Sequence, residues 1–373
     1  MSDWFIIDIA VFMVVMTLTG IIIPQILLIA FRKNLYDEVN PRKVHSGSIP
    51  RLGGIAFFPS ILFAILLVFG IGAYYFPKQI LSIPPTDITS LCFVCCAVIV
   101  LYLVGMADDL IGLRYRAKFM AQIFCACLIF VGGLSLNNLH GFLGIHTMPV
   151  IVDLGLTILL TVFITNALNL IDGIDGLASG LSAVACAFYG MIYVEAGDQA
   201  YALLSFATLG AMVPFFYYNV FGNAKKHSKI FMGDTGALTV GLILSVLSIH
   251  ICQLDASKLK ANAAVVAIAP LLIPCFDVVR VYVHRIHCHR NPFLPDRSHI
   301  HHKLLALGMS QRVAMPTIVG TGIVLTAANY WFSTFVNINI LFAIDAVLWI
   351  VANILISKAI RRRAKRTGII LWE

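Results

Sequence analysis

The sequence predicts an all-α, polytopic integral membrane protein with about eleven transmembrane helices. Of the 373 residues, 60% are hydrophobic and only 12% are charged, whereas soluble domains carry about 25% charged residues. Apolar segments recur along the whole chain, and several reach the roughly 20 residues that a helix needs to cross a bilayer. Because no long polar segment interrupts them, we expect one transmembrane domain over residues 1–357 and a basic cytoplasmic tail over residues 358–373.

The apolar segments divide into eleven predicted spans with short connections, so neighbouring spans should be antiparallel. In order, the spans are residues 5–31, 53–76, 88–107, 118–136, 150–170, 177–194, 200–218, 236–252, 262–283, 313–333 and 338–357. Cys92, Cys95 and Cys96 have the spacing of a metal-binding pair. They lie inside the third apolar run, which favours ordinary helix residues over a metal site.

The distribution of lysine and arginine predicts the orientation of these spans. Lys78, Lys258 and Lys260 are expected on one side of the membrane, and the other 23 of the 26 Lys and Arg residues fall on the opposite side. Such residues concentrate in cytoplasmic loops. The N-terminus should therefore lie outside and the C-terminus inside, which requires an odd number of spans. The basic run at 361–366 favours an anchor to anionic lipid over a nucleic-acid site.

Four polar clusters follow odd-numbered spans and should therefore meet at the cytoplasmic face. Charged residues near a bilayer are costly, which makes such clusters functional candidates. The clusters are Asp108-Asp109; Asn166, Asn169, Asp172 and Asp175 in NALNLIDGIDGL; Asp234 in KIFMGDTGA; and Asp296, Arg297, His299, His301 and His302 in PDRSHIHH.

The chemistry of these clusters indicates phosphate handling with a divalent metal. Carboxylates suit Mg²⁺, which usually also binds substrate phosphates, and lysine, arginine and histidine suit phosphate oxygens. Together they can neutralise the charge that builds during phosphoryl transfer. Adjacent Asp108 and Asp109 diverge by about 100° on a helix, so they should have different roles. Asp172 and Asp175 should share a helical face.

Each cluster also has a structural interpretation. The first pair could be ordinary acids at a helix end, and the aspartates of the second and third clusters could be helix caps. The histidines could form a zinc site, but no set of four matching ligands is present in the sequence. Asp277 and Arg280 are interpreted as a helix-stabilising i, i+3 ion pair. Asp345, in the middle of the last span, has no predicted role.

Five ordered motifs resemble the polyprenyl-phosphate N-acetylhexosamine-1-phosphate transferase family, over roughly residues 41–308. The motifs are PRKVHSGSIPRLGG (41–54), GMADDLIGLRYRAKFMAQ (105–122), NALNLIDGIDGL (166–177), KIFMGDTGA (229–237) and PDRSHIHHKLLALGMS (295–310). The resemblance implies that a polyprenyl phosphate oxygen attacks the β-phosphorus of a UDP-linked N-acetylhexosamine, with UMP as leaving group. It also implies a requirement for Mg²⁺, with Mn²⁺ as an alternative.

The resemblance also implies roles for individual residues. Asp234 and Asp172 would bind the metal; Asp108, Asp109, Asp172 and Asp175 would be catalytic, with either Asp108 or Asp109 as the base. Substrate binding would involve Lys43, Arg51, Lys118, Asn169, Gly173, Asn219, Phe231, Arg297, His299, His301 and His302, with His45 as a weaker candidate. Within this set, Asn169, Gly173, Asp175 and Phe231 would shape the nucleotide pocket.

The histidine pattern favours one branch of this family. The branch that makes peptidoglycan lipid I typically has three consecutive histidines followed by Phe-Glu, whereas this chain has His-Ile-His-His-Lys at 299–303. That pattern resembles the branch that uses UDP-N-acetylglucosamine and undecaprenyl phosphate to start cell-surface polysaccharides or teichoic-acid-type polymers. Another UDP-N-acetylhexosamine and the lipid I reaction remain the alternatives.

The expected setting is the cytoplasmic membrane of a bacterium. The partners would be the sugar nucleotide, the polyprenyl phosphate and membrane lipid, without nucleic acid; a homodimer is left open. A secondary transporter is the competing class, but transporters place their sites near the bilayer midplane, whereas these carboxylates cluster at one rim.

Overall fold

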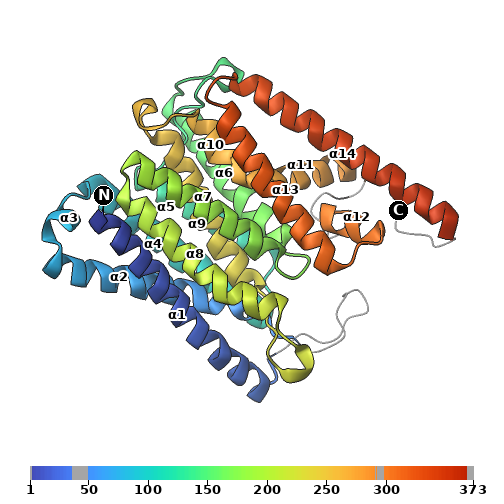
Figure 1. The fold of residues 1–373 in the computed structure, drawn as a ribbon, viewed down its shortest axis with the longest axis horizontal. Helices are drawn as coiled ribbons and strands as arrows, with labels where there is room; N and C mark the ends of the chain where they lie inside the picture. The colour runs from blue at the N-terminus through green and yellow to red at the C-terminus, as the bar shows by residue number, and fades with distance from the viewer. Residues whose placement is uncertain (1, 36–48, 290, 292–297, 368–373) are drawn as a thin grey trace.

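The computed structural model describes residues 2–35, 49–289, 291 and 298–367. This part of the chain is almost entirely helical (Figure 1). The long helices are α1 (Ser2–Arg32), α2 (Phe57–Tyr75), α4 (Pro85–Ile111), α5 (Tyr115–Val131), α6 (Val150–Ile171), α7 (Leu177–Ala196), α8 (Gln199–Val220), α9 (Gly233–Gln253), α11 (Leu272–His287), α13 (Gln311–Phe332) and α14 (Ile338–Thr367). The short ones are α3 (Pro77–Leu81), α10 (Ala263–Ile268) and α12 (Ile300–Ala306), with 3-10 turns at Gly53–Ala56, Phe142–Gly144, Ala224–Lys226, Ala256–Lys258 and Ala269–Leu271.

Ten helical segments in the described part of the chain are long and apolar enough to cross a membrane. They match ten of the eleven predicted spans, and the architecture is that of a polytopic membrane protein. The remaining predicted span corresponds to α5, which has 17 residues and so lies at the lower limit of roughly 17–25 residues for a crossing helix. The total of eleven therefore stays a prediction.

α5 nevertheless runs antiparallel to α4 along its whole length. At one end, Lys118 of α5 contacts Asp108 near the end of α4. At the other end, the Ser90 hydroxyl near the start of α4 donates a hydrogen bond to the carbonyl of Gly132, just beyond α5. The packing of α5 between α4 and α6 thus brings the chain from one end of the molecule to the other.

Two predicted segments differ in detail from the helices. The segment predicted at 262–283 is interrupted by the 3-10 turn at Ala269–Leu271, which contains Pro270, a residue that lacks the backbone N–H of a continuous helix. The last helix does not end at residue 357 but continues to Thr367. The basic run at 361–366 is therefore an extension of α14.

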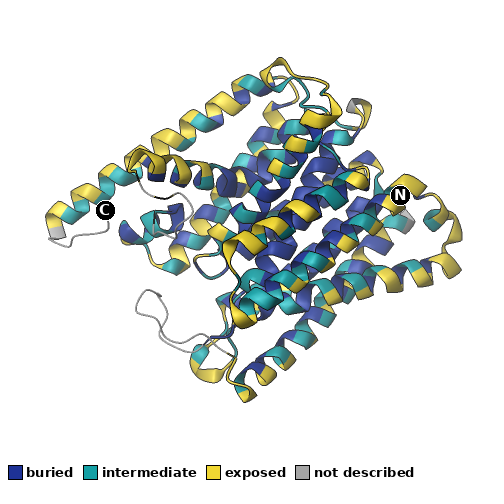
Figure 2. Ribbon diagram, turned by 180° about the vertical axis from the view of Figure 1, so that it is seen from behind, coloured by how far each residue is buried: buried dark blue, intermediate teal, exposed yellow. Residues whose placement is uncertain are grey.

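α9 forms the centre of the bundle. Of its most apolar stretch, 94% is buried inside the molecule, and it packs against α4, α6 and α10. A helix that is hydrophobic all round belongs in such an interior position. Figure 2 shows a dark, buried centre surrounded by helices with many exposed residues. Large apolar side chains are numerous among the exposed residues of α1, α2 and α14.

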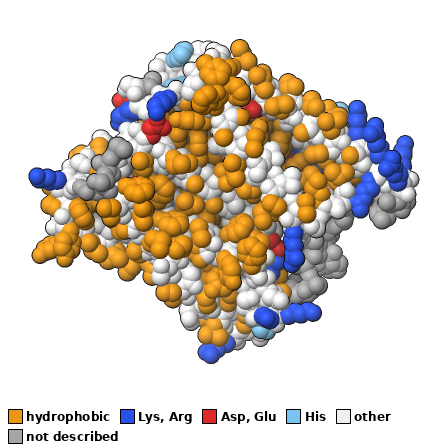
Figure 3. All heavy atoms as spheres, viewed as in Figure 1, with side chains coloured by type: hydrophobic (Ala, Val, Ile, Leu, Met, Phe, Trp, Pro, Cys, Tyr) orange, Lys and Arg blue, Asp and Glu red, His pale blue; other side chains and the backbone are white. Residues whose placement is uncertain are grey.

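The connections between helices divide between two ends of the bundle. Among the described residues, one end holds those that follow α1, α4, α6, α8 and α11, and the other end holds those that follow α2, α5, α7, α9 and α13. In Figure 3, basic side chains gather at the first of these ends, including the end of α14, while apolar side chains cover the surface between. This arrangement agrees with the antiparallel order expected from the sequence.

Candidate active site

A lysine between two aspartates lies at the centre of the candidate site. The Nζ atom of Lys118, on α5, is 2.8 Å from Asp108 Oδ2 at the end of α4 and 2.6 Å from Asp234 Oδ2 at the start of α9. All three side chains are partly exposed. Three predicted site residues from three motifs are thus in direct contact, and the ammonium group offsets the repulsion between the two carboxylates.

Asp109 has a different role from its neighbour. Its Oδ1 accepts a hydrogen bond from the backbone N–H of Asp234 (2.7 Å), and its Oδ2 accepts from the N–H and hydroxyl of Thr235 (2.9 and 2.6 Å). The first N–H groups of a helix lack partners within the helix. Asp109 therefore caps α9 from α4 and fixes Asp234, so the predicted division of labour between the two aspartates follows from the direction in which each points.

The start of α9 leaves no room for a side chain at Gly233. This residue has a φ of +71°, and a Cβ there would collide with the Arg51 carbonyl and the Asp109 carboxylate. Only glycine adopts this conformation without strain and permits so close an approach. The glycine of the MGD motif thus allows Asp109 to reach the helix.

Asn169 completes the immediate surroundings of Asp234. Its Nδ2 donates to Asp234 Oδ1 at 2.9 Å from the end of α6. One turn earlier on α6, the amide of Asn166 pairs reciprocally with that of Gln122 on α5. Asn166, a member of the second polar cluster, thus contributes to the packing of α5 on α6, while Asn169 contacts the carboxylate of Asp234.

The Asp-Gly-Ile-Asp-Gly loop between α6 and α7 holds two further carboxylates, Asp172 and Asp175. The prediction that they share a helical face is wrong, because the helix ends before them at Ile171. Burial, together with the charges of Asp175 and Asp234, raises the pKa of Asp172 to about 7. Asp175 forms an ion pair with Lys229, whose Nζ lies 2.5 Å from Asp175 Oδ2. Lys229 opens the KIFMGDTGA motif, and nothing in its sequence spacing reveals a partner 54 residues away.

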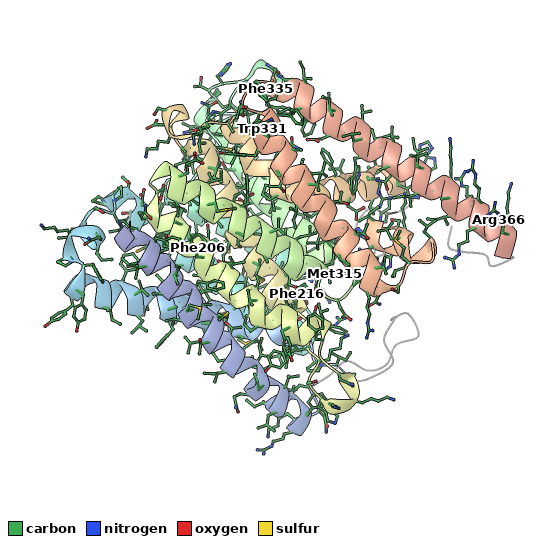
Figure 4. The ribbon with its side chains drawn as sticks, viewed as in Figure 1. Phe206, Phe216, Met315, Trp331, Phe335 and Arg366 are labelled. Carbon is green, nitrogen blue, oxygen red and sulfur yellow. The ribbon has the colours of Figure 1, made fainter. Side chains whose placement is uncertain are left out.

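Asn219 links this loop to the segment before α9. Its Oδ1 accepts from the N–H of Gly176 (2.6 Å), and its Nδ2 donates to the Ile230 carbonyl (2.8 Å). Beside it, the side chains of Phe216 and Met315 pack against Gly176, and Figure 4 shows them close to one another. Both polar groups of Asn219 thus serve the shape of the site, and its contact with substrate stays a prediction.

The segment before α9 also pairs with the segment before α2. Phe231 N–H donates to the Pro50 carbonyl, and the N–H groups of Gly53 and Gly54 donate to the carbonyls of Phe231 and Met232, all at 2.9 Å. This pairing brings Arg51 to the site, where its charge acts on Asp172. Lys43, His45 and Arg297 lie outside the described residues.

The three histidines lie together at the start of α12, next to the loop that contains Asp172 and Gly173. The rings of His299 and His301 are parallel with centroids 5.7 Å apart, and His302 lies 4.2 Å from His301. A Cβ at Gly173 would overlap the His301 ring, so the glycine permits this contact. His301 is 1% exposed with no hydrogen bond to either ring nitrogen, and burial lowers its pKa to about 3.

Asp277, which the sequence pattern paired only with Arg280, has a wider role. This fully buried carboxylate on α11 contacts Arg280 (2.8 Å), His299 Nδ1 (2.9 Å) and the N–H of Ile300 (3.0 Å). It therefore orients the first histidine and caps α12. The ion pair predicted from the i, i+3 spacing is confirmed; the contact with His299 depends on chain folding 22 residues later.

The donor set is compatible with a divalent cation. Asp172 and Asp234 are oxygen donors that act electrostatically on one another, and a cation between them would relieve that repulsion. Among the described residues, no three His, Cys, Asp or Glu side chains form a ready-made metal cage. Mg²⁺ needs none, since it is typically held by one or two carboxylates together with substrate phosphates and water.

The fold and the site define a polytopic membrane protein with carboxylate, lysine and histidine groups gathered at one end of a helical bundle. Residues 91–252, from α4 to α9, match the model of glycosyl transferase family 4. The chain is 33% identical over 349 residues to a probable undecaprenyl-phosphate N-acetylglucosaminyl 1-phosphate transferase of Bacillus subtilis, covering 90% of each chain.

Two further relatives are undecaprenyl-phosphate alpha-N-acetylglucosaminyl 1-phosphate transferases. The one from Escherichia coli (strain K12) is 33% identical over 294 residues, which is 78% of this chain and 74% of the relative. The one from Salmonella typhimurium is 32% identical over 296 residues, with the same coverage. The chain belongs to glycosyl transferase family 4, in agreement with the resemblance seen in the five motifs.

Proposed function

We propose that this protein transfers N-acetylglucosamine 1-phosphate from UDP-N-acetylglucosamine to undecaprenyl phosphate at the cytoplasmic face of a bacterial cytoplasmic membrane. The products are UMP and a lipid-linked pyrophosphoryl sugar that starts a cell-surface polymer. The contact of Lys118 with both Asp108 and Asp234 carries the proposal, because a cation between carboxylates at the rim of a membrane bundle suits two phosphates that must approach each other. The names and similarity of the relatives support the choice of substrates.

In the proposed reaction, an oxygen of undecaprenyl phosphate attacks the β-phosphorus of the sugar nucleotide. A new P–O bond forms, the bond between the β-phosphorus and the bridging oxygen breaks, and UMP leaves with the electron pair. Asp108 orients the attacking phosphate and accepts its proton when that phosphate is monoprotonated. Asp109 is bonded to the start of α9 by both oxygens, so it keeps Asp234 in place and is not the base.

The remaining residues bind and orient the donor. Lys118 and the histidines of α12 face the phosphates, where positive or hydrogen-bonding groups favour the transition state. The Asp172 loop and the Phe231 segment, held together by Asn219, form the nucleotide side of the site. Asp234 and Asp172 would hold Mg²⁺, which when bound supplies charge neutralisation at the diphosphate.

A direct assay tests the proposal. Purified protein with Mg²⁺, undecaprenyl phosphate and radiolabelled UDP-N-acetylglucosamine should give a labelled lipid and an equal amount of UMP. Turnover of UDP-N-acetylmuramoyl-pentapeptide in place of UDP-N-acetylglucosamine would instead assign the lipid I reaction.

Replacement of the central carboxylate tests the site. Asp234→Ala should abolish Mg²⁺-dependent turnover while the protein still inserts and purifies as a folded species. Asp255→Ala, in the exposed loop after α9, is the matched control and should keep the wild-type rate. A near-normal rate for Asp234→Ala would remove this residue from the metal site.

A further inference from the structure

α14 is attached to the rest of the protein by polar side chains, although most of its surface is apolar and exposed. Only 17% of its most apolar stretch is buried. Between residues 351 and 355, Asn353 is the one buried side chain, 6% exposed, and its neighbours are exposed. A buried asparagine in an otherwise lipid-facing helix indicates an interhelical hydrogen bond.

The partner of Asn353 is Lys303 of α12. The Lys303 Nζ donates to Asn353 Oδ1 and to Ser357 Oγ, both at 3.1 Å. Asn353 and Ser357 are four residues apart, so they share one face of α14. Burial, and the nearby charge of Arg280, lower the pKa of Lys303 to about 8, in keeping with an enclosed amine.

A second contact lies one to two turns further along α14. Arg363 Nη1 donates to the carbonyl of Ala306, the last residue of α12, at 3.3 Å. The same guanidinium lies against Gly308, where a Cβ would overlap it. α14 thus contacts the middle and the end of α12 at two separate levels, and the basic extension predicted only as a lipid anchor contributes one of them.

α12 is the helix that carries the histidines of the site. Its start is fixed by Asp277 of α11, which bonds His299 and the N–H of Ile300. Seven residues cannot form a stable helix alone in water, so the position of α12 depends on such tertiary contacts. Its second half is held by packing on α13 and by the polar contacts from α14.

We propose that Asn353 and Ser357 are positioning residues for the transferase site: through Lys303, the middle residue of α12, they help to hold this helix, and with it His301 and His302, against the Asp172 loop. The inference rests on the proposed function for its kinetic consequence. It assigns to the last helix, whose sequence resembles a plain membrane anchor, a part in setting the geometry of the site.

The test compares two double variants of α14. Asn353→Leu with Ser357→Ala removes both acceptors and leaves an apolar helix. Ile350→Leu with Ile354→Ala introduces the same two residues, at the same spacing, in place of two exposed apolar side chains. The acceptor variant should lower kcat/KM for UDP-N-acetylglucosamine at least about tenfold, since small displacements of catalytic groups have large kinetic effects. The control variant should match the wild type.

Two further readouts separate positioning from general damage. Asn353→Asp and Ser357→Thr keep an acceptor oxygen at each position and should restore most of the rate. Hydrogen–deuterium exchange at the backbone of residues 300–306 should be faster in the acceptor variant than in the control, while exchange in α9 stays unchanged.

The outcomes are distinguishable from failure of the proposed function. Equal kinetics and equal exchange in the two double variants would overturn the inference, as would a lower rate with unchanged exchange at 300–306. If the wild type gave no product from these substrates, the proposed function would fall. The exchange comparison would still decide whether α14 holds α12.

Discussion

Two adjacent aspartates show how much a single side chain's direction matters at this site. Asp108 and Asp109 follow each other at the end of α4, yet one contacts Lys118 and the other caps α9. The sequence predicts that their roles differ, because neighbours on a helix diverge. The sequence does not predict which aspartate has which role. The partners lie on other helices, and the local sequence pattern does not indicate how those helices pack against α4.

This difference predicts effects of unequal size on stability. Asp109→Ala leaves the first N–H groups of α9 without an acceptor and should lower the free energy of unfolding by about 1–3 kcal/mol. Asp108→Ala removes one of two carboxylates that share a lysine and the acceptor of one backbone N–H, that of Leu113, so it should lower Tm less than Asp109→Ala, while turnover is lost. Thermal unfolding in detergent measures both, and an equal fall in Tm for the two variants would contradict the assignment.

The buried His301 ring predicts a dependence of stability on pH. Its pKa is lowered to about 3 from an ordinary 6.5, so between these values the unfolded chain binds a proton that the folded protein does not. Stability is therefore full above about pH 6.5 and declines as the pH falls, by up to about 1.4 kcal/mol per pH unit. The difference in Tm between wild type and His301→Gln should shrink from pH 7 to pH 4.

A surface histidine provides the control for this experiment. His146→Gln makes the same substitution at an exposed residue in the loop after α5, and its Tm is compared with that of the wild type at each pH. If the Tm difference between wild type and His301→Gln stayed constant from pH 7 to pH 4, the ring would be taking up its proton in the folded protein as it does in the unfolded chain, which would contradict the lowered pKa.

At the scale of helices, the short α12 is the element that sequence patterns did not reveal. Its seven residues are too few for a periodic signal, and the sequence places the histidines only in a polar cluster after the ninth predicted span. The longer helices were found because twenty-residue apolar runs are unambiguous. The limits of that signal appear at Pro270, inside a predicted span, and at α5, whose 17 residues leave its crossing undecided.

The contact between α11 and α12 predicts a large effect of Asp277. Because Arg280 and His299 lose a shared, fully buried partner, Asp277→Ala should lower the free energy of unfolding by about 3–5 kcal/mol. Turnover should fall as well, although this carboxylate faces α12 rather than the Lys118 centre. Denaturation of the purified variant, with Asp255→Ala as control, measures the loss; a change within about 0.5 kcal/mol would refute the capping role.

At the scale of the whole molecule, the uneven distribution of cations predicts a defined orientation. Fusions of alkaline phosphatase, which folds only where disulfides form, report the side of each loop. Fusions after Gly144 and Lys260 should be active, and fusions after Arg114 and Lys226 inactive. Activity after Gly144 would also establish that α5 crosses the membrane; inactivity there would leave the odd number of spans without support.

The motifs are spread over the chain, and only the bundle brings them together. Order and side could be predicted, because alternation of spans places every odd-numbered connection at the same end. Individual contacts could not be predicted, because they depend on how the loops at that end fold against each other. Examples are the contact of Lys229 with Asp175 and those of Asn219 with Gly176 and Ile230.

The burial of α9 at the centre has a consequence for how the protein is made. Asp234, at its start, is fixed by Asn169, Lys118 and Asp109, which precede it by 65, 116 and 125 residues. A growing chain that has inserted everything up to α8 already carries four of the site's aspartates and the contact of Asp108 with Lys118, but it lacks Asp234 and the N–H groups that Asp109 caps. The ribosome must still release α9 and then α12, so the newly made protein acquires its first turnover only with the last third of its synthesis.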